Sequence, residues 1–501
     1  MVNTVLHYPH IPALVIGFTA LIVYFPARYF NFHNKYLALI TAFSLLMAVL
    51  YILLEDDLLN LLSGLHGPMN DYINSGLQAG FLSGNDPAAR LLSLAVLGLS
   101  FLISIFNAGY LQFEKRLYSF YPLFLLMVSG LIAMLFVVDL LGLYLLCEMM
   151  SICAYALVAF RRREEVAVEA GFKYLIMGSV ASVVILLGIG LILSSTGTLK
   201  LEMLSPSVDW QVQVGGLLLL AGFGLKSALV PLHTWLPDAH GSAPSSISAF
   251  LSGVLVQVVL YVAVKSTLLL GIDAKLVGTI LLLLSALNIL LGNLMGIVQV
   301  NLKRMLGYST VAQMGYIALP IAVGLRNGSQ LALQSAFFIL ISHACAKGLA
   351  FLNAGIFNHL YGLRDIKEIR DHDAMSPTPI LSLAVAVISL SAIPPLPGFT
   401  GKWAVLTSVH SSAESYAVLI TILVLFGSLI AFGYYLPLIV TLIIAYQKQQ
   451  QRLPSERKRV SFWMSFPVII LVGLILLLTF FPQFWMDQTV EAAAFLKALV
   501  S

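Results

Sequence analysis

A few charged residues lie inside long apolar stretches, and their chemistry is the most informative feature of the sequence. Glu148 has two turns of apolar residues on each side, in LGLYLLCEMMSICAY. Five lysines lie within or at the edge of similar stretches: Lys173, Lys226, Lys265, Lys347 and Lys402. A charge at the centre of a membrane helix costs about 3 kcal/mol on insertion scales, so such side chains usually face the interior of a helix bundle.

A buried Glu–Lys pair can act as a switchable proton store. A lysine in an apolar site can exchange protons near neutral pH, whereas a nearby carboxylate stabilises the charged ammonium. The pattern of charges therefore predicts a pathway for protons or other cations. A soluble enzyme would not need it.

Each of these charges also has a structural alternative. Glu148 and Lys226 are too deep to reach an interface, and they could form an inert ion pair, although we favour a functional one. Lys173 lies behind Glu169, so it could anchor its helix at the interface or tune the Glu148–Lys226 pair. Lys265 lies near a helix end, where we expect its long side chain to snorkel to the interface.

A second group of residues could continue the pathway. Lys347 follows His343 by four residues, so both lie on one helix face and could form a relay, although a lone histidine more often packs in the core. Lys402 resembles Lys226 in its context. Three further polar residues could orient water between these sites or join helices by hydrogen bonds: Ser252, Gln257 and Gln313.

The composition indicates that the chain is a membrane protein. The chain has 501 residues, of which 59% are hydrophobic and only 10% charged, and its mean hydropathy is +0.95. A net charge of +4 is too small to indicate a nucleic-acid partner. Continuous apolar stretches of about 20 residues predict an all-α polytopic protein of about fourteen transmembrane helices. They lie near 11–31, 36–54, 91–110, 120–137, 139–160, 170–195, 213–232, 245–268, 276–298, 304–325, 331–357, 377–411, 415–445 and 461–482.

The distribution of lysine and arginine over alternate loops predicts the topology. Loops on one side carry Arg28, Lys35, Lys115, Arg116, Arg161 to Arg163, Lys303, Arg304, Arg364, Lys367, Arg370 and the run from Lys448 to Arg459. The other side carries only Arg90, Lys200, Lys275, Arg326 and Lys497, together with Asp56, Asp57, Asp71 and Asp86. Because cytoplasmic loops carry the basic excess, we expect a plasma (inner) membrane protein with both termini outside the cytoplasm.

Prolines interrupt two of the predicted helices. Pro231 and Pro237 follow Lys226, and the run Pro394–Gly398 precedes Lys402. A membrane tolerates such breaks only inside protein or beside a water-filled cavity. Two broken helices five spans apart suggest an inverted repeat.

Several long motifs, in order, resemble the antiporter-like subunits of respiratory complex I. The same family includes Mrp-type cation/proton antiporter subunits and the membrane arms of energy-converting hydrogenases. The resemblance covers about residues 90–410. It rests on VVDLLGLYLLCEMMS, FKYLIMGSVAS, KSALVPLHTWLPDAHGSAPSSISAFLSG, NLKRMLGYSTVAQMGY and SAIPPLPGFTGKW.

The resemblance implies a domain organisation and a role for each charge. Three N-terminal helices (1–118) would precede two inverted five-helix repeats (119–270 and 271–446), each with a half-channel, and a cytoplasmic loop and last helix (447–501) would follow. Glu148 would face a neighbouring subunit. Lys226 and Lys402 would be the lysines of the two broken helices, and His343 and Lys347 would bridge the halves along a central polar axis.

The chain departs from the family at Gln257, where a lysine or histidine is usual. Glutamine can orient water but cannot hold a proton, so direct hopping from Lys226 toward the second half is in question. The long lateral helix of one complex I subunit type is also absent. Lys265, two turns further along, is a poor geometric substitute.

Two functions remain open at this stage. The first is a proton- or sodium-translocating subunit of a redox-driven membrane complex, beside other membrane subunits that include antiporter-like homologues. The alternative is a subunit of an Mrp-type sodium/proton antiporter without a redox partner. Neither a redox cofactor nor a metal site is expected in this chain, because Cys147, Cys153 and Cys345 lack metal-ligand spacing and no Gly-rich nucleotide loop precedes a helix.

Overall fold

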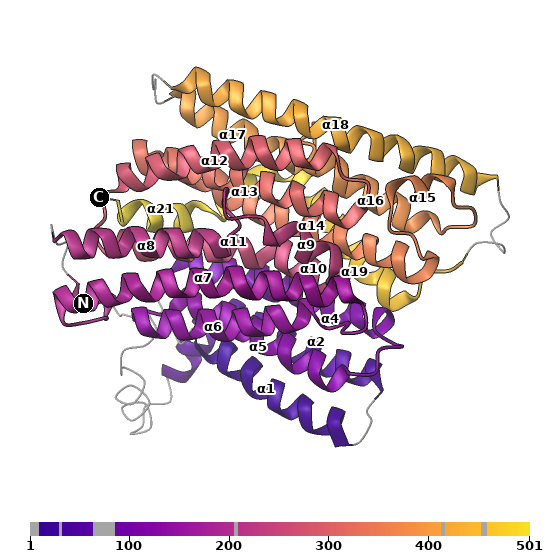
Figure 1. Cartoon of the computed structure of the whole chain (residues 1–501), viewed down its shortest axis with the longest axis horizontal. Helices are drawn as coiled ribbons and strands as arrows, with labels where there is room; N and C mark the ends of the chain where they lie inside the picture. The colour runs from indigo at the N-terminus through magenta and orange to yellow at the C-terminus, as the bar shows by residue number, and fades with distance from the viewer. Residues whose placement is uncertain are drawn as a thin grey trace.

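The computed structural model describes residues 10–29, 33–63, 86–204, 209–411, 416–451 and 458–500, and its regular elements there are helices. Most of them run along one common direction (Figure 1). Their bounds are α1 His10–Tyr29, α2 Asn34–Ser63, α4 Pro87–Tyr110, α5 Leu117–Phe136, α6 Leu140–Val158, α7 Glu165–Thr196, η1 Leu201–Met203, α8 Trp210–Lys226, α9 Trp235–Ser242, α10 Ser245–Phe250, the π-helical turn η2 Leu251–Leu255, α11 Val256–Leu269, α12 Ala274–Ile297, α13 Leu302–Asn327, α14 Gln330–Tyr361, α15 Ile366–Asp371, α16 Pro377–Leu390, α17 Pro397–Ser411, α18 Ala417–Gln450, α19 Phe462–Phe480, α20 Pro482–Asp487 and α21 Val490–Ala498.

Twelve helical segments of the described chain are long and apolar enough to cross a membrane. One of them, Ser245–Leu269, combines α10, η2 and α11. The two broken segments, α8–α9 and α16–α17, account for the remaining two of the fourteen predicted spans. The prediction of an all-α polytopic membrane protein is therefore confirmed.

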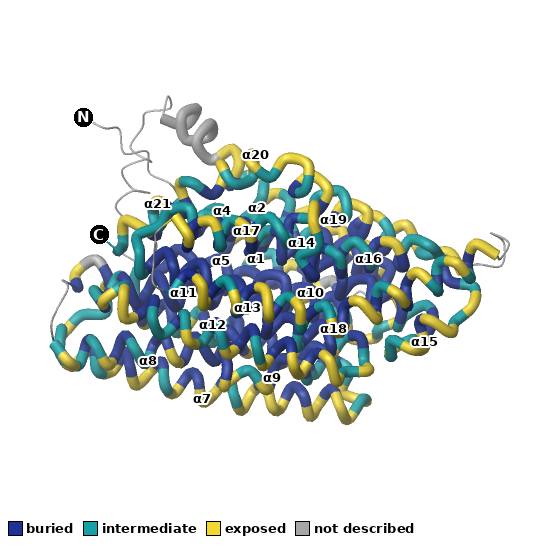
Figure 2. The backbone as a smooth tube through the Cα atoms, turned by 90° about the horizontal axis from the view of Figure 1, so that it is seen from above, coloured by how far each residue is buried: buried dark blue, intermediate teal, exposed yellow. Residues whose placement is uncertain are grey.

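The helices form a buried centre and an apolar rim. The most apolar window of Ser245–Leu269 is 100% buried within the chain, whereas that of α18 is only 33% buried. Figure 2 shows the same contrast between α10, α11 and α13, which are largely buried, and the outer edge along α7. The rim exposes large apolar side chains such as Phe172 and Leu187, as a surface that contacts lipid or another membrane subunit requires.

Polar caps define where several helices begin. Asp86, Asp139 and Asn301 precede α4, α6 and α13, and each accepts a hydrogen bond from a backbone N–H of the first turn. These caps satisfy donors that have no partner within the helix. They therefore fix the ends of the helices that carry or contact the charged residues.

The first broken helix is held open by a side chain from α12. α8 ends at Lys226, and Ala228 has a φ of 56°. Asn288 accepts a hydrogen bond from Val230 N at 2.8 Å and donates to the Ala228 carbonyl at 3.2 Å. The backbone groups freed by the break are thus satisfied inside protein, as the membrane requires. Pro237 lies within α9, so the expectation that it interrupts the helix was wrong.

The second break repeats a feature of the first. Each begins with a Ser-Ala pair and ends with Pro-Leu, in Ser227–Leu232 and Ser391–Leu396. In both, the alanine has a positive φ, which is 58° at Ala392. Here Gln313 donates to the freed carbonyl of Leu390 at 3.1 Å, so its amide helps to hold the break open.

Loops predicted to share one side of the membrane also meet in the structure. Side chains join the loops before α5, α7 and α15, through Arg161–Glu114 at 3.0 Å and Arg364–Glu164 at 3.6 Å. Lys448 donates to the carbonyl of Arg370 in α15, which lies at one end of the bundle in Figure 1. At the opposite end a β-bridge joins Asp139 and Lys200. Asp71, the side chains of Asp56 and Asp57, and residues 452–457 of the basic run lie outside the described residues.

Candidate functional site

Glu148 and Lys226 form an ion pair between α6 and α8. Lys226 Nζ lies 2.9 Å from Glu148 Oε1 and also donates to Ser151 Oγ at 2.8 Å. Ser182 of α7 donates a hydrogen bond to the same carboxylate. The Lys226 side chain is 4% exposed, whereas that of Glu148 is 24% exposed. The carboxylate therefore reaches the rim while its ammonium partner lies inside.

Lys173 does not contact this pair. Its ammonium lies 2.8 Å from Glu169 and 3.0 Å from Asp238, and its side chain is about half exposed. These two carboxylates balance the charge of the Lys173 ammonium, so Lys173 needs no contact with Glu148 or Lys226. Of the two expectations for Lys173, these contacts favour an anchor at the interface over direct tuning of the Glu148–Lys226 pair.

Lys265 is buried, and the expectation that it snorkels to the interface was wrong. Its Nζ lies 2.5 Å from Asp86 and 2.8 Å from the Leu135 carbonyl. Tyr261, one turn earlier on the same face of α11, donates to the same carboxylate. Asp86, expected among loop acids, is 2% exposed. Asp86 thus both caps α4 and pairs with Lys265, and this pairing allows the lysine to be buried inside the bundle.

Gln257 lies in the buried segment Ser245–Leu269, two residues after the end of the π-helical turn Leu251–Leu255. It is fully buried, and neither atom of its amide has a hydrogen-bond partner among the described residues. π-helical turns often occur at functional sites because they shift the register of the backbone. Here the turn presents the Ser252 carbonyl to His343 Nε2 at 3.2 Å, while the Ser252 hydroxyl contacts Thr310 at 2.7 Å.

His343 and Lys347 lie on one buried face of α14, as their spacing predicts. Lys347 Nζ donates to Ser309 Oγ at 2.6 Å and to the Leu306 carbonyl at 2.8 Å. Neither acceptor is charged. Ser309 in turn contacts the hydroxyl of Tyr435 on α18. The lysine therefore lies among hydroxyl and carbonyl groups of α13, with a hydroxyl contact onward to α18.

Lys402 lies in the second turn of α17 and faces the core. Its ammonium donates to Ser428 Oγ at 3.1 Å and lies 3.5 Å from the centre of the Tyr316 ring, a favourable cation–π contact. A cavity of about 20 Å³ is lined by both His343 and Lys402. A cavity of about 10–15 Å³ is large enough to hold one water molecule. The cavity therefore offers a place for a bridging water between the two residues.

Sequence reasoning missed the neutral partners of these charges. Serine and tyrosine hydroxyls contact Lys226, Lys347, Lys402 or the partners of these lysines: Ser151, Ser182, Ser309, Tyr316, Ser428 and Tyr435. Hydroxyl residues in apolar helices commonly bond to a backbone carbonyl of their own turn, so their spacing carries little signal. The described residues contain no group of three metal-ligating side chains, and all three cysteines are free.

Comparison with protein families identifies the central part of the chain. Residues 138–431 match the family profile described as NADH:quinone oxidoreductase/Mrp antiporter, TM. This range begins before Glu148 and ends beyond Lys402, so it includes both broken helices, Glu148 and the five lysines described above, but not Asp86.

Individual relatives and solved structures agree with this match. NADH-quinone oxidoreductase subunit N of Desulforudis audaxviator is 36% identical over 328 residues, which are 64% of this chain and 64% of that protein. Subunit N of Desulfitobacterium hafniense is 31% identical over 425 residues, 80% of this chain and 84% of the relative. A chain of the archaeal membrane-bound sulfane sulfur reductase has the same fold, with a TM-score of 0.80, 24% identity and coverage of 98% and 100%.

Proposed function

Because this chain belongs to the NADH:quinone oxidoreductase/Mrp antiporter transmembrane family, we propose that it conducts protons across the membrane as one subunit of a larger redox-driven complex. The chain would sit in the plasma membrane beside other membrane subunits, antiporter-like homologues among them. Redox chemistry would occur in those partners. Two relatives of this chain carry the name NADH-quinone oxidoreductase subunit N.

The observation that carries this proposal is the series of ionisable groups buried at the centre of the bundle. Lys226, Lys347 and Lys402 are each at most 8% exposed, on three different helices. Burying a charge costs several kcal/mol, and apolar residues of similar size would often be at least as stable. Ionisable residues in membrane spans therefore mark ion pathways by default.

The contacts support proton transfer in two steps, one in each half of the chain. In the first half, the charged Glu148 would stabilise the charged form of Lys226. Neutralising the carboxylate would therefore favour release of a proton from the lysine, and restoring its charge would favour capture of one. In the second half, His343 and Lys402 line one cavity, so a water molecule there would join them. Lys347 lies one turn from His343 and has only neutral partners within the described chain, which leaves its ammonium free to give up a proton.

Gln257 occupies the gap between these halves. Buried polar groups are nearly always hydrogen-bonded, and both polar atoms of this amide lack a protein partner among the described residues. We infer that water bridges this gap, held by the Gln257 amide and the Ser252 hydroxyl. An ordered water can carry a proton where no titratable side chain is present.

Lysine-to-methionine substitutions test the proposal. Methionine keeps the length of the side chain and removes the charge, so Lys226→Met and Lys402→Met should assemble and lose most proton transport. Lys275→Met provides the control, because Lys275 is exposed at a helix end. Transport is measured by dye quenching in vesicles that contain the whole complex. Normal transport by both core variants at normal abundance would support a structural role instead.

A second candidate, exchange of sodium for protons, is favoured by the same Gln257. Its amide oxygen is buried without a donor among the described residues, and carbonyl oxygens are ligands for hard cations. An added lysine in Gln257→Lys should repel a bound cation but be tolerated in a hydrated proton path. Loss of only the sodium-dependent activity would favour exchange. Unchanged proton transport and unchanged sodium dependence would exclude sodium at this position.

We also propose the domain organisation and orientation from the sequence. The three N-terminal helices (1–118) precede the inverted repeats 119–270 and 271–446, and residues 447–501 form the last loop and helix. The shared pattern of the two breaks supports this division. The basic loops would face the cytoplasm and both termini the opposite side. Subunits that copurify with the chain would distinguish a redox complex from an Mrp-type antiporter.

A further inference from the structure

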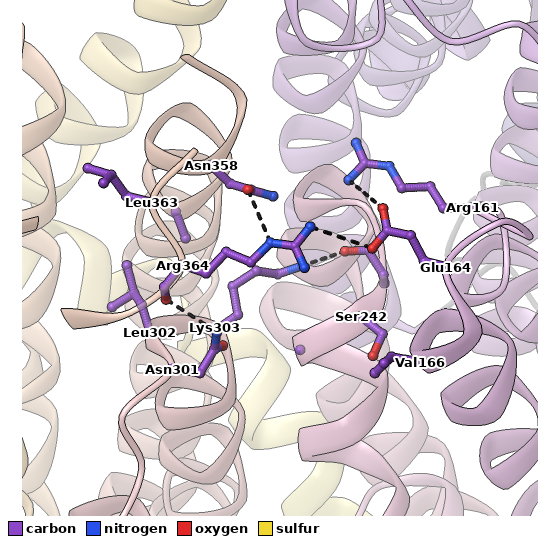
Figure 3. A pocket seen from close by; sticks show the side chains of 13 residues that line it. Arg161, Glu164, Val166, Ser242, Asn301, Leu302, Lys303, Asn358, Leu363 and Arg364 are labelled. Atoms are coloured by element: carbon purple, nitrogen blue, oxygen red, sulfur yellow. Dashed lines mark hydrogen bonds and ion pairs between the residues drawn. The ribbon is translucent and has the colours of Figure 1, made fainter. Parts of the chain in front are cut away.

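A cavity of about 110 Å³ opens where the loops before α7, α13 and α15 meet (Figure 3). It lies at the basic end of the bundle, away from the Glu148–Lys226 pair. Three basic side chains line it, and each comes from a different loop or helix end: Arg161, Lys303 and Arg364. Such a convergence of cations on one cavity is not needed for ion conduction through the core.

The charges around this cavity do not balance. Glu164 lies 3.6 Å from Arg364 and 3.9 Å from Arg161, so two guanidinium groups share one carboxylate. Arg161 has a second partner in Glu114 at 3.0 Å. Lys303 has no carboxylate partner among the described residues, and its ammonium donates only to the carbonyl of Ala243. With Lys303 protonated, the group therefore carries one positive charge more than its carboxylates neutralise.

A single negative charge would complete this arrangement. Half-buried cations without a counterion are costly, because the ammonium has given up water without gaining a charged partner. Guanidinium and ammonium groups that converge are the usual ligands of phosphate oxygens. The amide of Asn358 also lines the cavity; its oxygen accepts from Arg364, so its N–H groups can donate to an oxyanion. We propose that this pocket, formed by Arg161, Lys303 and Arg364, binds a phosphate group that carries one negative charge.

The surroundings indicate which source of phosphate fits. A phosphodiester carries one charge, and basic pockets between helices on the cytoplasmic side are typical of anionic lipid headgroups. Val166, at the edge of the pocket, is 67% exposed. Further along α7, Ile176, Val180 and Val183 are exposed at helical spacing, so an acyl chain could lie along this face. Free inorganic phosphate would use the same cations but not this apolar face.

The test measures phosphate ligands on the intact purified complex. Native mass spectrometry, after reconstitution with phosphatidylglycerol, should detect bound lipid in the wild type. Lys303→Gln and Arg364→Gln should each reduce it about tenfold, which corresponds to about 1.4 kcal/mol. Arg163→Gln is the matched control, since Arg163 is exposed on the same loop as Arg161 but does not line the pocket.

Two further measurements identify the source of the phosphate group and control for misfolding of the variants. Inorganic phosphate at millimolar concentration is titrated against the lipid: displacement would assign the site to free phosphate, and lack of displacement would assign it to the lipid. Lys303→Arg keeps the charge and should retain binding. Equal retention of lipid by wild type, Lys303→Gln and Arg364→Gln, with no effect of inorganic phosphate on any of them, would overturn the proposal. So would a wild type that binds neither ligand.

Discussion

Replacing Glu148 by glutamine tests how far the buried ion pair drives transport. Glutamine has nearly the same shape as glutamate, so it can still accept hydrogen bonds from Lys226 and Ser182. Only the charge is lost. The substitution therefore separates the electrostatic contribution of Glu148 from its packing and its hydrogen bonds.

The structure sets the size of the expected effect. At the 2.9 Å separation of Lys226 Nζ and Glu148 Oε1, the Coulomb attraction is about 6 kcal/mol for an effective dielectric constant of about 20. Glu148 is 24% exposed, so solvent screens part of this attraction. Breaking a buried pair typically costs about 3–5 kcal/mol, and after this discount we expect about 2–3 kcal/mol. A change of that size between the charged and neutral forms of Lys226 should slow transport at least tenfold.

The assay compares Glu148→Gln with a control that removes a similar pair from the surface. Glu169 lies 2.8 Å from Lys173, but it is 64% exposed, so Glu169→Gln should cost at most about 1 kcal/mol. Proton transport is measured in vesicles and normalised to the amount of assembled complex. Glu148→Gln should assemble normally and transport poorly, while Glu169→Gln should resemble wild type. Normal transport by Glu148→Gln, or an equal loss in both variants, would refute the argument.

Three further predictions follow from other parts of the structure. Asp86→Ala should lower the free energy of unfolding by about 3–5 kcal/mol, because it leaves Lys265 buried without its partner; Asp86→Ala with Lys265→Met should recover part of this loss in a thermal unfolding assay, and no recovery would argue against the pair. In intact cells, an impermeant thiol reagent should label Lys275→Cys but not Arg459→Cys, and the reverse pattern would invert the proposed topology. Backbone N–H groups of residues 365 and 364 hold the pKa of Glu368 below its ordinary value, so this cap should persist at neutral pH and be lost as the pH falls through that lowered pKa; the protection of those two amides against hydrogen exchange, relative to the intrinsic rate at each pH, should fall in acid, and at pH 7 in Glu368→Ala.

Sequence reasoning found the helices and the deep charges because a membrane makes both conspicuous. Apolar runs of bilayer length have few alternative folds. A charge such as Glu148, with two apolar turns on either side, can be satisfied only inside the bundle. The spacing of His343 and Lys347 likewise placed both on one face of α14, which the structure bears out.

The partners of these charges could not be predicted because they come from segments far apart in the chain. Asp86 lies 179 residues from Lys265, and its place at a helix start suggested a loop. The same carboxylate caps α4 and pairs with the lysine, and only the packing of α4 against its neighbours brings the two together. The mistaken expectation for Lys265 thus came from treating its helix in isolation.

The two breaks explain why Lys226 and Lys402 occupy different positions in similar motifs. Aligning Ser227 with Ser391 places Lys226 opposite Leu390 and Lys402 opposite Asp238, so one lysine precedes its break and the other follows it. In an inverted repeat the two broken helices cross the membrane in opposite directions. Figure 1 shows α8 and α17 toward the same end of the bundle and α9 and α16 toward the other. Placing Lys226 at the end of α8 and Lys402 in α17 therefore puts both lysines on the same side of their breaks, as the proton path that we propose along the membrane requires.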